Sequence, residues 1–419
     1  MHIHLLPLGS AGDVFPLMWL GRLLKARGHE VTMITSCLFE KHILDQGLKC
    51  VPLGRAEDFE ALLQDPRIWQ LLQGPKALFE EAIKLAETYL SAVESHPPVD
   101  LILAPVTAIA GRLAREKLGV PLITMHMQPA PVMSAYEPPL LHPAFKSFRT
   151  RPLWFKKLIL SLPNPVDFIV MPKLRALCKQ NGVAPPRSFF RDWWDSPDGT
   201  LMLFPDWFAA PQPDWPREML QWTFPLEDLG GGKALSPELA AFLDAGEPPV
   251  LFTAGSANKQ AARFFQTAVE SMRRLGRRAM LLTRYPSQVP ADLPPGCIVV
   301  EYAPFSHLLP RAAALVHHGG IGTLSQAFAA GVPQLIMPMA HDQPDNADRI
   351  ERMGAGLSIQ PDHFEPERVT AALRRLLTEP SFRETSQKYA GLLAVKPDTD
   401  VLLRWVESHA KHPVTRATP

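Results

Sequence analysis

The chain has 419 residues, of which 46% are hydrophobic and 20% charged, and its formal net charge is +1. This length suits two domains of ordinary size with proper cores. The near-neutral charge argues against nucleic acid as the main partner. Four scattered cysteines show no paired spacing, so we expect reduced core residues and neither a disulfide frame nor a structural zinc site.

The N-terminal residues, MHIHLLPLGSAGD, read as one short strand without the charged start and apolar run of a signal peptide. No uncharged apolar run reaches the roughly 18 residues that a membrane span needs. We therefore expect a cytoplasmic protein.

The N-terminal half alternates strands and helices. Apolar runs predict strands at 2–8, 31–35, 101–104 and 121–125, and helical periodicity predicts helices at 15–27 and 112–118. Near-continuous apolar strands between helices are typical of a parallel sheet covered on both faces.

Residues 128–165 interrupt this alternation with many prolines and aromatic residues, including Tyr136 and Trp154. Long irregular insertions in compact domains are usually functional. Within the insertion, 145–162 mixes five basic side chains with apolar ones. We interpret it as a helix covering the domain or as a wall of an apolar acceptor pocket, and less readily as a peripheral membrane contact.

The alternation restarts after a glycine-rich stretch. Strands are predicted at 250–253, 279–282, 298–300, 313–317 and 334–337, and helices at 262–275, 323–330 and 400–410. This pattern predicts an N-terminal domain (1–223), a linker (224–236), a C-terminal domain (237–397) and a final helix (398–419) that packs back on the first domain. Two such α/β domains place a ligand cleft at the carboxyl ends of their strands.

The segment from His317 to Thr323, HHGGIGT, is the most informative part of the chain. It predicts a buried strand, a glycine turn and a helix start, where unpaired amides and the helix dipole bind anions. His318 can donate to a phosphate oxygen. Asp342 and Gln343 follow the next strand and offer groups for hydroxyls. A phosphate beside a polyhydroxyl group indicates a nucleotide-sugar.

Asp13 lies in GSAGD, between the first strand and the first helix. Local physics favours a helix N-cap, whereas a position at the carboxyl edge of the sheet would suit a general base. A second strand-to-helix turn at Ser256 could hold a donor phosphate or be a plain turn. Tyr302 and Ala303 follow a strand and could stack on and bind a base, although a core aromatic is the default.

His126 ends a strand and could face an acceptor, although a structural histidine is equally expected. No set of His, Cys, Asp and Glu has the spacing of metal ligands, so we expect no metal. No serine-nucleophile motif is present.

Together these residues resemble the UDP-glycosyltransferase family, nucleotide-sugar glycosyltransferases of the GT-B fold. The resemblance covers essentially the whole chain and is strongest at 9–17 and 302–346. Within the family, the chain is most similar to the rhamnosyltransferases of bacterial rhamnolipid synthesis, including the segments 203–216 and 341–349. The resemblance implies two Rossmann-like domains that face each other across a cleft.

By position, the resemblance assigns the nucleobase to Tyr302 and Ala303 and the sugar hydroxyls to Asp342 and Gln343. Its diphosphate contacts fall in the helix-start segment, at His318, Gly320, Gly322 and Thr323. Asp13 falls where many members have a catalytic histidine and the rhamnolipid-type and glycopeptide-type enzymes have aspartate. That comparison makes Asp13 a base and not merely a cap.

Two positions depart from the plant-type members. Gln326 replaces a glutamate that binds the ribose, which would suit a deoxythymidine donor, although glutamine also binds a ribose. The aspartate that supports the plant-type histidine has no counterpart near 101–108, so no His–Asp dyad is expected.

The sequence therefore predicts an inverting, metal-independent transferase that needs no cofactor beyond its dTDP- or UDP-sugar co-substrate. L-rhamnose from dTDP-rhamnose and a hydroxy fatty-acid lipid acceptor follow from the resemblance, with His126, Tyr136 and Trp154 as acceptor-side candidates. The alternative is a UDP-glucose- or dTDP-sugar-dependent O-glycosyltransferase of flavonoid- or terpenoid-type aglycones. A nucleotide-sugar epimerase or isomerase is the rival enzyme class, and a non-enzymatic nucleotide-sugar sensor a third option.

Overall fold

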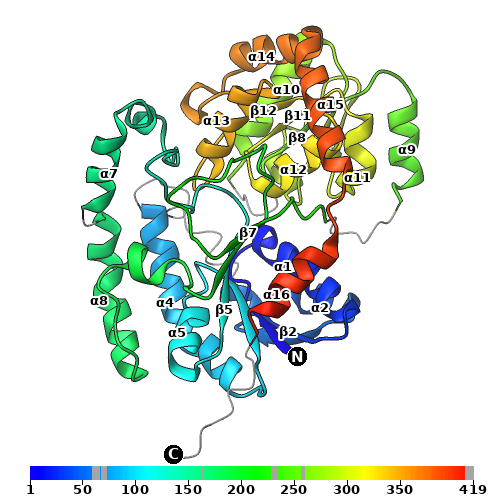
Figure 1. The fold of residues 1–419 in the computed structure, drawn as a ribbon. Coiled ribbons are helices and arrows are strands. Elements are labelled where there is room, and N and C mark those ends of the chain that lie inside the picture. Colours follow the sequence, from blue (N-terminus) through cyan, green and yellow to red (C-terminus); the bar gives the residue numbers. More distant parts are fainter. Residues whose placement is uncertain (59–66, 68–72, 163, 228–233, 256–259, 411–419) are drawn as a thin grey trace, which may run out of the picture. The chain divides into compact units, whose positions relative to one another are not determined.

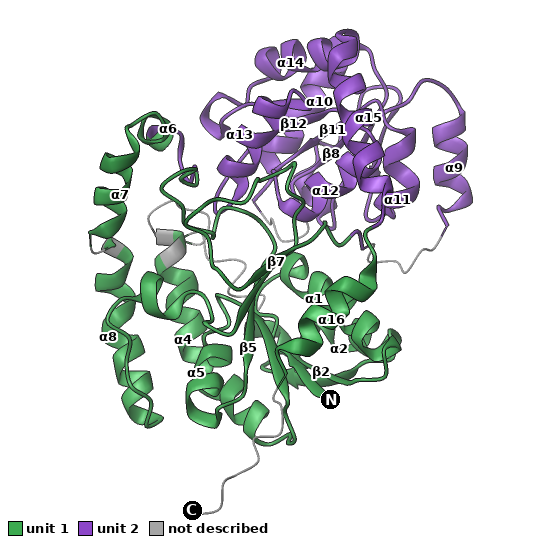
Figure 2. Cartoon of the chain, viewed as in Figure 1, with its two compact units in different colours: residues 1–139, 145–225, 397–419 green, residues 140–144, 226–396 purple. Residues whose placement is uncertain are grey.

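The computed structural model describes residues 1–419 except 59–66, 68–72, 163, 228–233, 256–259 and 411–419 (Figure 1). Contacts divide the chain into two compact units (Figure 2). Unit 1 contains Met1–Pro139, Phe145–Pro225 and the C-terminal segment from Pro397, and unit 2 contains Leu140–Ala144 and Leu226–Lys396. The segment 140–144 thus groups with unit 2, although it lies within the range expected for the first domain. Part of the expected linker, 228–233, lies outside the described residues.

Unit 1 is built on a seven-stranded sheet in the order β3-β2-β1-β4-β5-β6-β7, and every pairing is parallel. Its strands are β1 (His2–Leu5), β2 (Glu30–Ser36), β3 (Lys49–Leu53), β4 (Leu101–Pro105), β5 (Leu122–His126), β6 (Gly199–Met202) and β7 (Met219–Gln221). Because β4 and β5 are buried along their whole length, both faces of the sheet are covered.

Helices lie on both faces of this sheet (Figure 1). The helices of unit 1 are α1 (Ala11–Ala26), α2 (Glu40–Asp45), α4 (Gln73–Glu94), α5 (Ile109–Leu118), α6 (Lys146–Arg149), α7 (Leu153–Ser161), α8 (Pro165–Gln180) and α16 (Thr399–Ser408). A core cluster joins α4, α5 and α8 to one face through residues such as Ile102 and Leu174. On the other face, Glu407 of α16 pairs with Arg27 and His29, which ties the C-terminal helix to the end of α1.

Unit 2 has a six-stranded, all-parallel sheet in the order β10-β9-β8-β11-β12-β13. Its strands are β8 (Val250–Thr253), β9 (Ala279–Leu282), β10 (Cys297–Val300), β11 (Ala314–His317), β12 (Gln334–Ile336) and β13 (Gly356–Ser358). Successive side chains of β8 enter different cores: Val250 and Phe252 join one cluster and Leu251 the other. Apolar residues at every position are therefore what this strand needs.

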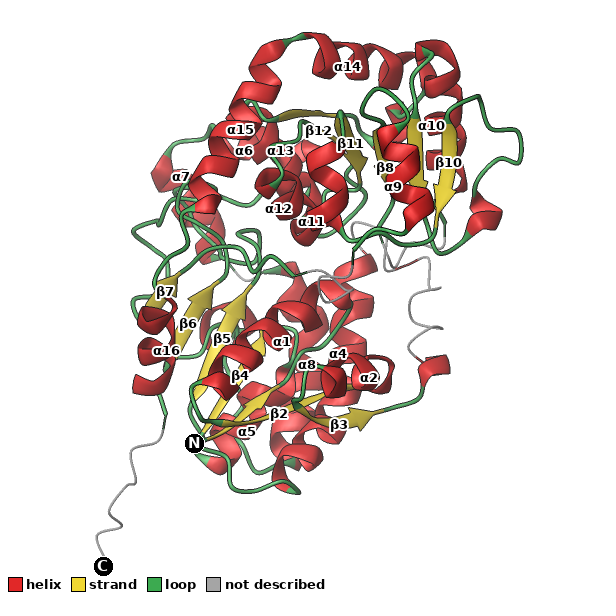
Figure 3. Ribbon diagram, turned by 90° about the vertical axis from the view of Figure 1, so that its right-hand side faces the viewer, coloured by secondary structure: helices red, strands yellow, loops and turns green. Residues whose placement is uncertain are grey.

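The helices of unit 2 cover these two faces (Figure 3). They are α9 (Pro237–Asp244), α10 (Ala262–Leu275), α11 (Phe305–Leu308), α12 (Ile321–Ala329), α13 (Gln343–Met353), α14 (Pro366–Thr378) and α15 (Pro380–Ala394). The prediction of two parallel-sheet α/β domains is confirmed. The predicted element ends shift slightly: β1 stops at Leu5, α1 begins at Ala11 and α12 begins at Ile321.

Candidate functional site

The candidate residues lie at comparable points of the two sheets. In unit 1, the loop that carries Asp13 follows β1, which pairs with β2 on one side and β4 on the other. In unit 2, His318 follows β11, which pairs with β8. Across each sheet, the strand numbering changes direction once, between β1 and β4 in unit 1 and between β8 and β11 in unit 2. Parallel sheets bind ligands at the carboxyl ends of the strands at such a switch point.

Asp13 is held at the third position of α1 by a capping box. The Ser10 backbone amide donates to its carboxylate at 2.9 Å, and the Ser10 hydroxyl accepts from the Gly12 amide at 3.2 Å. The N-cap is therefore Ser10, so the local interpretation of Asp13 as the N-cap is wrong. Reciprocal capping explains this, because the acidic group at the third position reaches back to the cap amide.

Burial raises the pKa of Asp13 from 3.8 to about 6, against the opposing effect of its hydrogen bonds from Ser10. Gly9 permits this close packing, since a Cβ there would lie 2.3 Å from the Asp13 Oδ2, and its φ of +131° favours glycine. The carboxylate is thus fixed in place, and its pKa approaches neutrality, as a general base requires.

The two adjacent histidines have different roles. His317 is fully buried; its Nε2 lies 2.9 Å from the Gln334 Oε1, and its Nδ1 accepts from the Gly319 amide at 3.1 Å. Burial lowers its pKa to about 3, so it is a neutral group that closes the glycine turn. Of the pair, His318 keeps a buried ring nitrogen without a hydrogen-bond partner among the described residues.

His318 is packed between two glycines. A Cβ on Gly255 would lie 2.8 Å from its Cε1, and one on Gly320 would lie 2.5 Å from its Nε2. Burial lowers the pKa of His318 to about 4, and its Nδ1 is buried without a hydrogen-bond partner among the described residues. A neutral imidazole still donates one N–H.

The start of α12 adjoins this ring and has no side-chain cap. Gly320 is its N-cap, and within the described part of the chain no group accepts from the amides of Ile321, Gly322 or Thr323. The space beside Gly322 is open. Free amides and the positive end of the helix dipole make this turn suited to an anion such as a diphosphate.

Asn346 connects the glycine turn to the Asp342–Gln343 pair. Its side-chain amide donates to the Gly319 carbonyl at 2.9 Å and to the Asp342 carboxylate at 2.6 Å. The Gln343 Oε1 accepts from the Met339 amide at 2.8 Å, so this side chain also holds the loop that follows β12. The adjacent His341 has a φ of +60°, an uncommon conformation for a residue other than glycine.

The other predicted donor contacts in unit 2 have mixed environments. Tyr302 is 41% exposed after β10, which leaves ring surface accessible to a base, whereas Ala303 is buried. Gln326 is buried in α12, and its amide donates to the Glu227 carbonyl at 3.2 Å. Ser256 lies outside the described residues.

The acceptor-side candidates in unit 1 do not form one cluster of described contacts. His126 is buried at the end of β5, with its Nε2 2.7 Å from the Asp195 Oδ1. Tyr136 contacts Lys157, whose Nζ lies 3.3 Å from the Tyr136 hydroxyl. Trp154 is 68% exposed on α7.

The sequence patterns did not identify several residues that position the candidate site. Ser10 was detectable, because serine three residues before an acid is the pattern of a capping box. Gly255, Asn346 and Asp195 carried no local signal, since their partners are distant in sequence or depend on the turn geometry.

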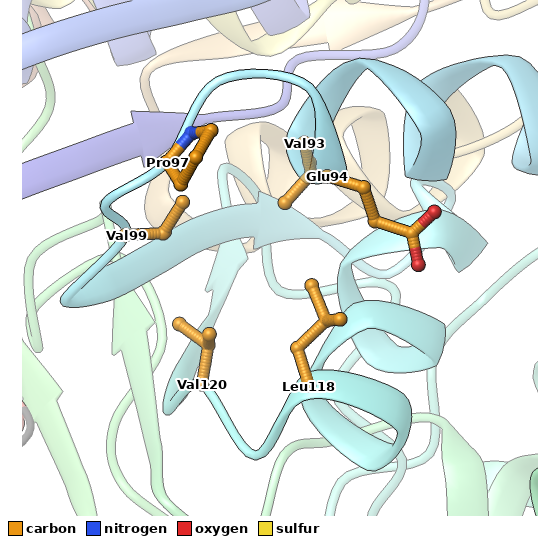
Figure 4. A pocket seen from close by; sticks show the side chains of 6 residues that line it. All are labelled: Val93, Glu94, Pro97, Val99, Leu118 and Val120. Atoms are coloured by element: carbon orange, nitrogen blue, oxygen red, sulfur yellow. The ribbon is translucent and has the colours of Figure 1, made fainter.

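A hollow of about 260 Å³ lies elsewhere in unit 1 (Figure 4). Its lining includes Val99 and Val120, which precede β4 and β5, so it opens at the opposite ends of the strands from Asp13. Among the described residues, no group of three or more His, Cys, Asp and Glu is placed to hold a metal ion. No described helix is both long and apolar enough to cross a membrane.

Solved structures identify the fold of the protein. The glycosyltransferase of kitacinnamycin superposes with a TM-score of 0.73 at 23% identity, covering 98% of this chain and 99% of that one. The spinosyn rhamnosyltransferase complexed with thymidine diphosphate gives a TM-score of 0.70 at 19% identity, covering 97% and 100%. These two likenesses show that the protein has the GT-B fold.

Its two halves match different family models. Residues 3–136 match the glycosyltransferase family 28 N-terminal domain, and residues 281–407 match the C-terminal domain of proteins like erythromycin biosynthesis protein CIII. The O-mycaminosyltylonolide 6-deoxyallosyltransferase of Streptomyces fradiae is 28% identical over an alignment of 441 residues, gaps included, that covers 100% of both chains. The matching models and this relative identify the protein as a glycosyltransferase.

Proposed function

We propose that the protein transfers L-rhamnose, with inversion, from dTDP-L-rhamnose to a hydroxyl of an apolar acceptor, without a metal ion. The observation that supports a nucleoside-diphosphate donor is the start of α12, which has no side-chain cap and lies beside the neutral His318. A diphosphate there would accept from the helix amides and from the imidazole N–H. The solved complex of the spinosyn rhamnosyltransferase with thymidine diphosphate supports this donor class.

The deoxythymidine preference is supported by Gln326. The neutral side-chain amide of Gln326 would accept a weaker hydrogen bond from a ribose 2′-hydroxyl than a carboxylate would, so binding depends less on that hydroxyl. Part of that amide is already engaged by the Glu227 carbonyl at 3.2 Å, which further limits its bonds to a ribose. Tyr302, with its accessible ring, is the proposed stacking partner of the thymine.

In the proposed reaction, the acceptor oxygen attacks the anomeric carbon of the sugar as the bond from that carbon to the diphosphate oxygen breaks. The Asp13 carboxylate takes the hydroxyl proton, and a pKa of about 6 makes it a better base than an ordinary aspartate. The bonding pair leaves with the diphosphate, whose added charge is stabilised by His318 and the α12 amides.

For the acceptor, we propose a hydroxy fatty-acid lipid, which follows from the likeness of 203–216 and 341–349 to rhamnolipid-type enzymes. A macrocyclic or other polycyclic aglycone is the second candidate. It is favoured by the Streptomyces fradiae relative, whose name gives a tylonolide as its substrate.

The test is incubation with dTDP-L-rhamnose in three arms: a β-hydroxydecanoyl ester, a macrolide aglycone, and no acceptor. We expect a rhamnosylated ester of inverted anomeric configuration by mass spectrometry and NMR, with little TDP release in the third arm. Product only with the aglycone would replace the lipid acceptor. An isomerised nucleotide-sugar without acceptor would establish the epimerase class instead.

A further inference from the structure

Helix α7 of unit 1 buries a lysine and exposes several of its apolar side chains. Within Leu153–Ser161, Lys156 is the buried residue, and its Nζ donates to the carbonyls of Tyr136 and Arg149, each at 3.3 Å. Arg191 likewise donates to the Ser161 and Leu162 carbonyls at the end of the helix. Cationic side chains therefore hold α7 to unit 1, where apolar ones normally would.

The apolar side chains of α7 and of the start of α8 face outward instead. They form what we call the α7–α8 apolar face: Trp154 (68% exposed), Leu158 (51%), Ile159 (39%), Leu162 (53%), Phe168 (73%) and Ile169 (37%). Helical spacing of four places Trp154 and Leu158 on one stripe of α7, and Leu162 follows directly after the helix. Figure 1 shows α7 and α8 following each other along one edge of unit 1.

The charged side chains in the α7 part of this face are basic. Residues 145–166 contain five lysines and arginines and no aspartate or glutamate. Asp167, directly before Phe168, is buried and accepts from the Ser188 hydroxyl and the Phe189 amide. Arg151 and Lys157 are exposed beside the apolar side chains. A tryptophan with leucine, isoleucine and phenylalanine, flanked by exposed basic residues, matches the two components of an interfacial membrane contact.

We propose that the α7–α8 apolar face docks the protein on an anionic lipid surface. Its apolar side chains enter the boundary between headgroups and acyl chains, and the flanking cations bind acidic headgroups. A second copy of the chain fits less well, because a twofold contact would bring these like charges together. An acceptor-pocket wall fits less well too, since it would enclose side chains that here are 37–73% exposed.

The proposal is independent of the identity of the sugar and acceptor, so its test measures vesicle binding and not turnover. The whole protein is sedimented with vesicles of phosphatidylglycerol and phosphatidylcholine, or of phosphatidylcholine alone. We expect binding to the anionic vesicles only, and weaker binding at high salt because ions screen the attraction. Equal binding to both kinds of vesicle, or binding to neither, would overturn the proposal.

The double variant Leu158→Glu/Phe168→Glu should lower vesicle affinity on the order of a hundredfold, because it removes two large apolar contacts and adds negative charge. Arg151→Ala should lower it about fivefold. The matched control is Leu392→Glu/Val395→Glu, which alters equally accessible apolar side chains of unit 2, 43% and 76% exposed, and should leave binding unchanged.

Two control measurements test whether the Leu158/Phe168 variant is folded and whether its oligomeric state is unchanged. Unchanged melting temperature and unchanged TDP affinity of the Leu158/Phe168 variant would show that both units remain folded. Sedimentation velocity without lipid should show the same species for wild type and variant. An oligomer that dissociates in the variant, or vesicle binding that survives both substitutions, would refute membrane docking.

Discussion

The backbone amide of Ser10 donates to the Asp13 carboxylate at 2.9 Å, and the Ser10 hydroxyl in turn caps the first turn of α1. One carboxylate therefore completes a capping box and is also the proposed base after the end of β1. Its pKa of about 6 reflects the balance between burial, which favours the protonated form, and these hydrogen bonds, which favour the charge. Structural and chemical roles of Asp13 are therefore compatible.

Asp13→Asn should abolish most turnover while preserving the fold. The side-chain oxygen of the introduced asparagine can still accept from the Ser10 amide, but an amide cannot take the acceptor proton. We expect kcat to fall by roughly 10²–10⁴-fold, with TDP affinity and melting temperature near those of the wild type. Steady-state kinetics and calorimetry check this, and near-normal kcat would remove Asp13 as the base.

The pH profile should report the same carboxylate. The proposed mechanism requires ionised Asp13, so kcat/KM should rise with pH through about 6. Ser10→Ala removes a hydrogen bond that lowers this pKa, so the acidic limb should move to higher pH. An acidic limb that stays in place in Ser10→Ala would assign it to another group.

Stability should show the opposite trend with pH. The folded-state pKa of Asp13 lies above its ordinary value of 3.8, so the folded protein binds this proton more tightly. The resulting stabilisation is fully present below about pH 4 and is lost as the pH rises through about 6. Urea titrations across this range should show that loss in the wild type and not in Asp13→Asn.

Local sequence patterns predicted the two parallel sheets and the glycine turn, because these structures depend on residues close together in sequence. Apolar strands such as 314–317 and the glycines at 319 and 320 act through neighbouring atoms. The setting of His318 was not predictable in this way. Its ring lies against Gly255, 63 positions earlier, and its lowered pKa follows from burial that no local pattern encodes.

His318→Ala should weaken nucleoside diphosphate binding by about 10- to 100-fold, which corresponds to the loss of one hydrogen bond to a charged group. The effect should be similar at pH 6 and pH 8, because a histidine with a pKa of about 4 is neutral at both. Isothermal titration with TDP checks the affinity. A loss confined to the lower pH would mean that the charged imidazolium is the binding form.

Gly320→Ala and Gly322→Ala form a matched pair at the start of α12. The first places a Cβ 2.5 Å from the His318 Nε2 and should displace the ring at a cost of about 1–3 kcal/mol. The second meets no atom within 4 Å and should raise stability by up to about 1 kcal/mol, as alanine favours helices. Melting curves distinguish the two, and equal destabilisation would contradict the packing around His318.

Gln326→Glu tests the choice between deoxyribose and ribose donors. A carboxylate accepts more strongly from a ribose 2′-hydroxyl than an amide does, so the ratio of UDP to TDP affinity should rise, by about tenfold for one hydrogen bond to a charge. The same change removes the donor to the Glu227 carbonyl and should lower the melting temperature. Gln326→Ala is the control, because it loses that contact without adding a charge. If both variants shift the UDP to TDP ratio equally, Gln326 supports the adjoining chain and does not select the nucleotide.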